Sequence, residues 1–412
     1  MAIPTINCII NFSTGPSFAS PMVLDSGQLG VNALADAAIV TADVSDQVSA
    51  ISIKRGRSAE SDQFQTGTLS LRIVDTNGDF NPMNVNGPYY NLLNPMRKVQ
   101  ITATYNGVAY ALFSGFITGY NTTTPQYTGD VSFTTITAVD AFRLAQNAQI
   151  STVTGATAGQ LSGTRINKIL DQIVWPTEQR QIDAGQTTMQ VDPGTARTAL
   201  AAMQTVEISE YGALYADAYG NMVFKDRLAA TTSVNQTAVA FNDNGTGIAY
   251  NNAVWIFNDA LVYNKADITR TGGTTQNATN TASIDKYFLH SYNQQNLLME
   301  TDAVALQYAQ AYVASRAETT VRCDAITLDL YTENYDAGII AALSLDYFDP
   351  VTITTTQPAA VGTSTLSKTL QVFGVSTEIK INSWKTTFTT LEPIIDGFIL
   401  DYSKLGEGSF SY

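Results

Sequence analysis

The sequence predicts a mainly β protein in which two small β-barrel or β-sandwich domains flank a mixed α+β region. Short runs of alternating apolar and polar residues, bounded by Gly, Pro, Asn and Asp, fill residues 46–150 and return after residue 255. Between them, apolar residues recur at helical spacing. Charged residues make up only 14% of the 412 residues, and the Thr, Asn, Gln, Ser and Tyr of half-exposed strands take their place.

Residues 1–45 are predicted to form a short N-terminal strand and an extended arm. Apolar stretches alternate here with breakers, as in NFSTGPSFASPMVLDSGQLG. Two interpretations stay open, because such an arm either packs on a neighbouring subunit or lies along the surface of its own chain.

Residues 46–150 are predicted to form the first β-barrel domain. VSAISIKRG and GTLSLRIVD alternate with period two, and VSFTTITAVDAFRL does so before turning helical at its end. Two further runs are joined by Asn106-Gly107, the strongest short signal for a hairpin. Five or six strands at this spacing are typical of a small barrel or sandwich.

Residues 151–255 are predicted to form an α+β middle domain. GTRINKILDQIVWP has helical spacing and stops at Pro176. DPGTARTALAAMQTVEISE predicts a second helix with Thr195 as its N-cap. YGALYADAYGNMVFKDR predicts a hairpin that turns at Gly220-Asn221.

Residues 256–412 are predicted to form a second β-barrel domain with one helix and a C-terminal tail. Alternating runs such as DPVTITT and TLQVFGVSTEIKIN indicate strands. The helix is predicted within TDAVALQYAQAYVASRAE, with one buried face composed of Ala305, Tyr308, Ala309, Tyr312 and Val313.

The acidic balance and the two cysteines limit the classes of function. With 22 Lys and Arg against 36 Asp and Glu, the net charge is −14. The general surface is therefore not expected to bind a nucleic-acid backbone, although DNA could slide past it, and solubility is the simpler explanation of the charge. With only Cys8 and Cys323, a disulfide framework and a Cys-based zinc cluster are excluded. Two reduced thiols are expected, and one long-range bridge between them is the alternative.

Targeting signals are also missing from the sequence. No basic residue precedes Lys54, as the start of a signal peptide would require. No apolar run approaches the roughly 20 residues of a membrane helix. We therefore expect synthesis in the cytoplasm and no membrane-spanning segment.

Most arrangements of catalytic residues are excluded by the number of histidines and by the motifs that the sequence lacks. His290 is the only histidine, so a metal site with two His ligands cannot form, and its aromatic neighbours predict a packing or hydrogen-bonding role. The motifs G-x-S-x-G, H-E-x-x-H and G-x-x-x-x-G-K-[ST] do not occur. Paired carboxylates of a glycosidase are not excluded by composition. We assign no catalytic, cofactor-binding or metal-binding residue.

Two further features are expected to be structural. Trp175, Trp255 and Trp384 are scattered along the chain and are expected in the core rather than on a carbohydrate platform. The basic run KRGR, residues 54–57, is too short for a nucleic-acid patch. It predicts either a solvated strand end or an ion pair at a subunit contact.

The stretch DTNGDFNP, residues 75–82, has the oxygen-rich composition of a calcium loop. Counting from Asp75, however, the sixth position of an EF-hand loop holds Phe instead of Gly, and the twelfth holds Asn instead of Glu. Asn77-Gly78 after an alternating strand is typical of a hairpin turn, in which Asp75 and Asp79 bond nearby backbone N–H groups. An irregular calcium site remains the alternative.

Five short motifs follow one another in a fixed order: R-G-R, G-T-x-x-L-x-L, N-G-D-F-x-P, P-x-R-x-V and L-F-x-G-x-I. They lie at Arg55–Arg57, Gly67–Leu71, Asn77–Pro82, Pro95–Val99 and Leu112–Ile117. With the later LDYFDPVTIT and QVFGVSTEIKINSWKTTFTTLEP, the chain resembles phage minor tail proteins of the tail-hub, or baseplate-hub, family. The resemblance covers roughly residues 45–400, and its specificity lies in the order of the motifs.

This resemblance implies a structural virion protein that is made in the host cytoplasm and assembled into the tail. Tail hubs are typically homotrimers whose two barrels per subunit give a pseudo-sixfold ring between the sixfold tail tube and the threefold tail tip or fibre. The expected partners are therefore a second and third copy, a tail-tube or distal tail protein, and a tail fibre or tip protein. Genomic DNA would pass through the lumen without specific binding. The family implies neither a cofactor nor an enzyme activity.

Two other classes of function stay open. The Tyr-, Asn- and Thr-rich surface would suit a receptor- or carbohydrate-binding tail-tip protein. Paired carboxylates would suit a wall-degrading glycosidase. A stable monomer in solution would count against the hub, binding to host glycans would favour the tip protein, and clearing of cell wall would favour the enzyme.

Overall fold

The structure is a computed structural model that describes most of the chain. The described residues are 3–12, 41–58, 63–123, 131–229, 236–331, 335–357 and 365–393. The extended arm predicted after the first strand and the predicted C-terminal tail lie outside these residues.

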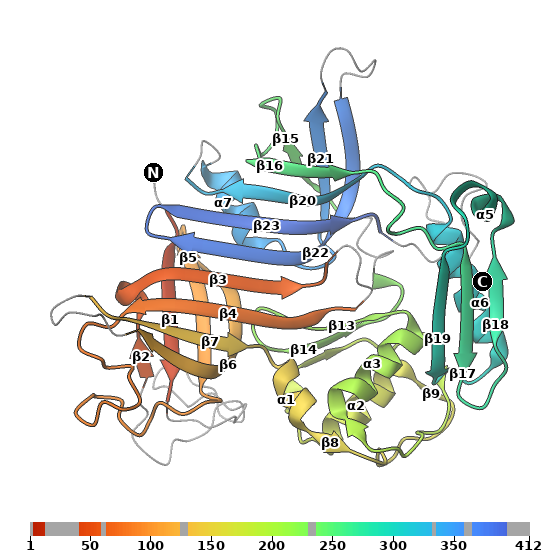
Figure 1. Ribbon diagram of the computed structural model, residues 1–412, viewed down its shortest axis with the longest axis horizontal. Helices are drawn as coiled ribbons and strands as arrows, with labels where there is room; N and C mark the ends of the chain where they lie inside the picture. The colour runs from red at the N-terminus through yellow and green to blue at the C-terminus, as the bar shows by residue number, and fades with distance from the viewer. Residues whose placement is uncertain are drawn as a thin grey trace.

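Thirteen strands of the described chain form one sheet, here called the main sheet, which contains strands of both predicted β units (Figure 1). Their order is β16-β20-β23-β22-β3-β4-β7-β6-β5-β1-β2, with β21 also on β22 and β15 on β21. The strands are β1 (Thr5–Asn11), β2 (Thr41–Asp43), β3 (Val48–Gly56), β4 (Gln65–Val74), β5 (Lys98–Tyr105), β6 (Val108–Thr123), β7 (Phe133–Val139), β15 (Val239–Asn242), β16 (Asn252–Ile256), β20 (Arg322–Asp329), β21 (Pro350–Thr356), β22 (Thr365–Lys380) and β23 (Ser383–Leu391). A short 3-10 helix, η1 (Ser45–Gln47), precedes β3.

The strands form where the sequence alternates. In β4, Leu69, Leu71 and Ile73 are buried on one face, while the residues between them are exposed. Asn106 and Gly107 join β5 to β6 with φ angles of 49° and 77°, the left-handed backbone that a two-residue hairpin turn requires. The predicted hairpin is confirmed.

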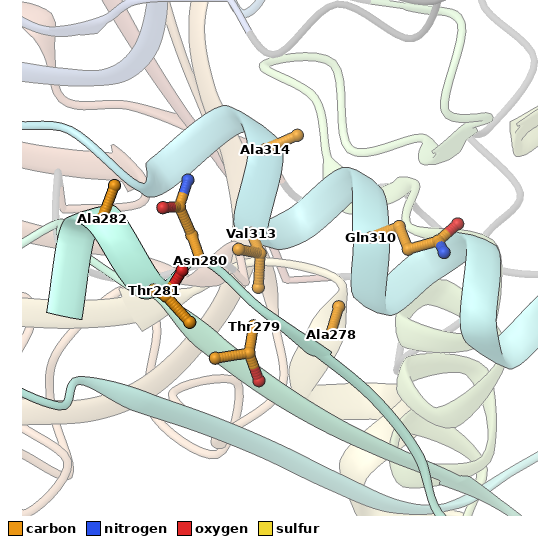
Figure 2. Close-up of a pocket in the computed structure, with 8 residues that line it drawn as sticks. All are labelled: Ala278, Thr279, Asn280, Thr281, Ala282, Gln310, Val313 and Ala314. Carbon is orange, nitrogen blue, oxygen red and sulfur yellow. The ribbon is translucent and has the colours of Figure 1, made fainter.

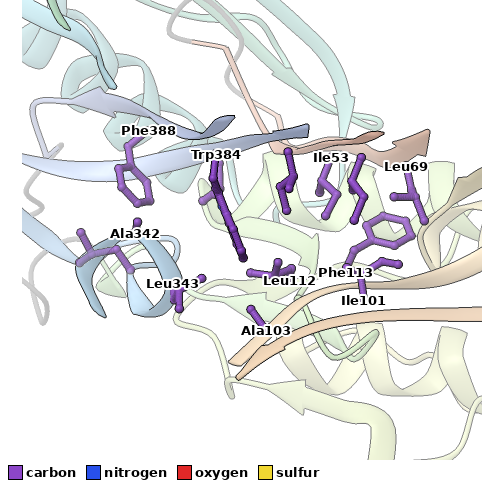
Figure 3. Packing of buried hydrophobic residues seen from close by; sticks show 14 of the residues in the cluster. Ile53, Leu69, Ile101, Ala103, Leu112, Phe113, Ala342, Leu343, Trp384 and Phe388 are labelled. Carbon is purple, nitrogen blue, oxygen red and sulfur yellow. The ribbon is translucent and has the colours of Figure 1, made fainter. Parts of the chain in front are cut away.

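The two β units share the main sheet because β22 pairs with β3. This antiparallel pairing runs from Gly374 opposite Gly56 to Lys380 opposite Ala50. The core is shared as well: Figure 3 shows Ile53 of the first unit near Trp384 of the second, with Leu343 of helix α7 (Tyr335–Ser344) below them. The fold class, mainly β with an α+β component, is confirmed; the proposed division into domains stays a prediction.

The middle region packs α-helices against small sheets below the main sheet (Figure 1). Its elements are α1 (Phe142–Asn147), β8 (Gln149–Ile150), β9 (Gln160–Leu161), α2 (Ser162–Gln172), η2 (Thr177–Gln179), β10 (Arg180–Ile182), β11 (Thr188–Met189), β12 (Arg197–Thr198), α3 (Ala199–Glu210), β13 (Ala213–Ala216) and β14 (Met222–Lys225). Both predicted helices and the hairpin at Gly220-Asn221 are present. The predicted N-cap is wrong: Thr198, not Thr195, accepts the backbone N–H of Ala201 at 3.1 Å.

A third body lies beside the other two, at the right of Figure 1, and we call it the α6 body. It consists of β17 (Lys265–Arg270), β18 (Gln276–Thr279), α5 (Thr281–Tyr287), β19 (Ser291–Leu297) and α6 (Asp302–Arg316), with strand order β18-β17-β19. The predicted face of α6 is confirmed, since Ala305, Tyr308, Ala309, Tyr312 and Val313 are its buried residues. In the described residues after 255, three helices, α5, α6 and α7, are present where one was expected, because α5 and α7 lack a long amphipathic pattern.

Within the described ranges, no helix combines the length and the apolar character needed to cross a membrane.

Candidate functional site

One buried carboxylate organises the start of the predicted calcium-like stretch. Asp75 is 3% exposed. One of its oxygens accepts the N–H of Asp79 at 2.7 Å, and the other accepts the N–H of Phe80 at 3.2 Å and the hydroxyl of Thr134 at 2.8 Å. The predicted turn role of Asp75 is therefore confirmed. For Asp79 the described residues show no such carboxylate bond, so its predicted role is wrong.

The stretch is not a hairpin turn, contrary to the prediction. β4 ends at Val74 and pairs with β3 and β7, whereas β5 begins at Lys98 and pairs with β1 and β6. Residues 75–97 connect these two non-adjacent strands by successive turns. In each turn a backbone N–H donates to the carbonyl three residues earlier, at Gly78, Asn81, Asn84, Gly87 and Tyr90. Among the described residues, no group of three or more His, Cys, Asp or Glu could hold a metal ion.

The single histidine and the two cysteines have structural surroundings. The Nε2 atom of His290 lies 3.1 Å from the carbonyl oxygen of Tyr287 and 3.8 Å from a carboxylate oxygen of Asp259. Cys8 and Cys323 are buried and free of any disulfide. Burial raises the pKa of the Cys8 thiol to about 12 and that of the Cys323 thiol to about 11, so both are protonated and unreactive at neutral pH. The predicted reduced thiols are confirmed.

The three tryptophans, and five tyrosines packed in the α6 body, are buried or half-buried. Trp175 and Trp384 are buried, and half-buried Trp255 donates its indole N–H to the Thr355 hydroxyl at 2.9 Å. The core of the α6 body contains a cluster of mutually packed tyrosines: Tyr211, Tyr263, Tyr292, Tyr308 and Tyr312. Because these rings contact one another, they do not form a flat surface platform of the kind that stacks on sugars.

The R-G-R motif forms a joint between the two β units. The Arg55 side chain is 7% exposed, and its guanidinium lies 3.3 Å from a carboxylate oxygen of Asp346. The guanidinium carbon of Arg57 lies 4.3 Å from the ring centroid of Phe373, a cation–π distance. The prediction of a solvated strand end is therefore wrong for Arg55, which is buried and paired within the chain. A subunit contact at this run stays a prediction.

The glycine of the same motif permits a close approach of the two units. Gly56 has a φ of +102°, and a Cβ atom there would lie 2.4 Å from the Cα of Gly374 and 2.4 Å from the carbonyl oxygen of Phe373. No real side chain fits at that distance from backbone atoms. The pairing of β3 with β22 therefore requires glycine at position 56.

A buried carboxylate next to this joint, that of Asp140, was not predicted from the sequence. Asp140 is 4% exposed and accepts the N–H groups of Gly67 at 2.5 Å and Phe142 at 3.0 Å. Burial raises the pKa of Asp140 to about 7, although these two hydrogen bonds and the charge of Arg55 lower it. Because a Cβ on Gly67 would lie 2.8 Å from this carboxylate, the first glycine of the G-T-x-x-L-x-L motif makes room for Asp140.

A groove of about 360 Å³ opens between β18 and α6 (Figure 2). It is lined by Ala278, Thr279, Asn280, Thr281, Ala282, Gln310, Val313 and Ala314. None of these residues is charged or can serve as a general base. The groove therefore offers hydrogen bonds and small apolar contacts, as a binding surface does, and no acid–base chemistry.

The chain is similar in fold to solved structures of tail proteins. No model of a protein family matches the sequence, and no curated protein matches it. Among solved structures, the 43 kDa tail protein of prophage MuSo2 from Shewanella oneidensis is 12% identical with a TM-score of 0.53, covering 86% of this chain and 96% of that one. A tail protein from Neisseria meningitidis MC58 is 9% identical with a TM-score of 0.54, covering 85% of this chain and 93% of that one. The chain thus shares its fold with two tail proteins over nearly their whole length.

Proposed function

We propose that this chain is a structural component of a phage or prophage tail, and that its place there is the hub. The supporting observation is the fold shared with two tail proteins across 93% or more of each. The ordered motifs from Arg55 to Ile117 support the same proposal from the sequence. The first of these motifs, R-G-R, forms the joint between the two β units, and Gly67 of the second makes room for the buried Asp140, which are structural roles.

The hub proposal includes a homotrimer. Its three copies would present six β units around an axis, matching the sixfold tail tube on one side and a threefold tip or fibre on the other. Tail-tube or distal tail proteins and fibre or tip proteins are the proposed partners, and the assembled virion tail is the proposed location. Both β units belong to one continuous sheet, so each subunit would enter such a ring as a rigid segment.

The proposed action is assembly and passage of DNA rather than catalysis. With a net charge of −14, a lumen formed by these subunits would repel the phosphate backbone and let the genome slide. The described histidine and cysteines have structural contacts, and the groove of Figure 2 has no charged residue. These surroundings support a non-enzymatic role, which is part of the proposal.

Carbohydrate recognition at the tail tip receives no support from the tyrosine cluster of the α6 body, although Tyr219, Phe257 and Phe288 are exposed elsewhere. That alternative depends on aromatic rings presented to solvent, and the five tyrosines of the α6 body pack against one another instead.

The mass of the purified protein in solution tests the trimer. Light scattering should give three times the 44.3 kDa of the single chain, with no dissociation on dilution. A stable monomer at all concentrations would contradict the trimer. Electron microscopy of the virion tests the hub itself: antibody or tag density at the distal end of the tail tube is expected, and density along the tube or on the capsid would refute the placement.

A further inference from the structure

The small sheet of the α6 body has an open edge. Its strand order is β18-β17-β19, so β18 pairs with β17 alone among the strands that the structure describes. Helix α6 packs against both β17 and β18. An unpaired strand edge is a template to which another extended chain can add a strand.

The open edge of β18 presents backbone groups that point away from the sheet. The N–H of Asn280, directly after β18, donates to the carbonyl of Asn264, directly before β17, at 2.8 Å. In an antiparallel pair, residues that bond the neighbouring strand alternate with residues whose groups point the other way. Counting back from Asn280, the outward-pointing residues are Thr279 and Asn277. Among the residues that the structure describes, their backbone groups have no outward hydrogen-bond partner.

The groove of Figure 2 lies at this open edge. It is lined by Ala278 and Thr279 of β18 and by Gln310, Val313 and Ala314 of α6, but by no residue of β17 or β19. The groove is therefore on the outer side of β18. The three α6 residues are spaced three and four positions apart, so they share one side of the helix. A fourth strand beside β18 would pack against this side of α6.

The lining determines which side chains such a strand can bring. None of the eight lining residues is charged, although the whole chain has a net charge of −14. A charged side chain would lose water in the groove without meeting an opposite charge. Most of the lining is alanine, threonine and valine, and the volume of about 360 Å³ suits a few small side chains. The matching occupant is an extended, uncharged segment with small apolar side chains at every second position.

We propose that this edge binds an extended segment of a different tail protein, which adds a fourth strand to the sheet beside β18. The backbone of that segment would bond the N–H and C=O groups of Asn277 and Thr279, and its apolar side chains would contact Val313 and Ala314. Backbone bonds then supply affinity, and the groove selects the side chains. Antiparallel pairing of β18 with the β18 of a second copy needs a twofold axis, which a threefold ring lacks. The choice of a different protein thus rests on the proposed trimer.

Binding of synthetic peptides to the full-length chain tests this proposal. The probes are two fluorescent peptides with blocked ends, STVTVTVS and STATATAS, and fluorescence anisotropy measures their binding. We expect saturable binding of at least one. Methylation of every second backbone nitrogen removes the N–H donors from one edge of the peptide only. One methylated set should therefore bind about tenfold more weakly, while the other set should bind like the parent peptide.

Matched variants of the protein locate the site. T279P removes an outward N–H of β18 and leaves the bonds to β17 in place, as proline does on natural edge strands. It should weaken peptide binding about tenfold, whereas T279A keeps the N–H and should bind like the wild type. A314W fills the groove from α6 and should abolish binding. A311W adds the same ring at an exposed position of α6 outside the groove and should leave binding unchanged.

The outcomes separate this site from the trimer. The proposal is overturned if neither peptide binds, if both methylated sets bind equally well, or if A311W weakens binding as much as A314W. An assembly of wild-type chains that T279P alone breaks apart would show that a second copy supplies the strand, and would also overturn it. A wild-type monomer that binds the peptide in the groove would refute the trimer and support the strand-binding site.

Discussion

Replacement of Asp75 by Asn isolates the carboxylate that organises residues 75–97. The change keeps the size of the side chain, and its remaining oxygen can still accept one backbone N–H. The new amide group, however, turns its own N–H groups toward the donors of Phe80 and Thr134, which lie 3.2 Å and 2.8 Å from the wild-type oxygen. Hydrogen bonds to a charged group contribute about 1.5–3 kcal/mol each, and a buried unsatisfied N–H costs about as much. We expect D75N to destabilise this connection by about 3 kcal/mol.

Hydrogen exchange of the backbone amides is the suitable assay, because a chain of this size need not unfold in one step. A loss of about 3 kcal/mol corresponds to roughly a 100-fold rise in the opening equilibrium of residues 75–97. D79N is the matched control, since the Asp79 carboxylate accepts no hydrogen bond among the described residues; its effect should stay within about 0.5 kcal/mol.

Calcium distinguishes the structural role from a metal site at the same residues. Because the Asp75 oxygens already bind three protein donors, millimolar calcium should leave the melting temperature of the wild type unchanged. A calcium-dependent rise of several degrees that D75N abolishes would refute the reasoning. So would equal exchange rates in D75N and D79N.

Three further outcomes follow from the same structure. Burial raises the pKa of Asp140 to about 7, above its value of 3.8 in the unfolded chain. Because the folded state binds the proton more tightly, the stability of the protein should fall as pH rises between about 4 and 7. D140N should flatten that part of a plot of melting temperature against pH. G56A should abolish soluble expression because its Cβ would lie 2.4 Å from backbone atoms, whereas G107A, with open space around it, should cost about 1 kcal/mol in denaturant unfolding. T198A should cost about 1 kcal/mol by removing the cap of α3, while T195A should leave the unfolding midpoint unchanged.

Local features of the fold are readable from the sequence because their signals are local. The buried face of α6 follows from apolar spacing along one helix. The β5–β6 turn follows from Asn106-Gly107, two residues that tolerate positive φ. The cap of α3 was misplaced by three residues because Thr195 and Thr198 have the same chemistry, and only the direction of the backbone decides between them.

Pairings between distant segments are not encoded in periodicity. Asn77-Gly78 correctly indicates a turn, but whether the following strand returns beside β4 depends on the whole sheet, and here it does not. The same holds for the joint: R-G-R marks a strand end, yet its partners Asp346 and Gly374 lie about 300 residues away. Gly56 and Gly374, two glycines within strand patterns, are the sequence feature that could have indicated this pairing.

The pairing of β3 with β22 also has a consequence for synthesis. Gly56 leaves the ribosome about 320 residues before its partner Gly374. At about 5–20 residues per second, β3 waits between roughly 15 seconds and a minute for the strand that covers its edge. During that time its backbone N–H and C=O groups form an open template for other nascent chains. We expect the yield of soluble protein to depend on how quickly translation reaches β22, and slow codons between these two strands to lower it.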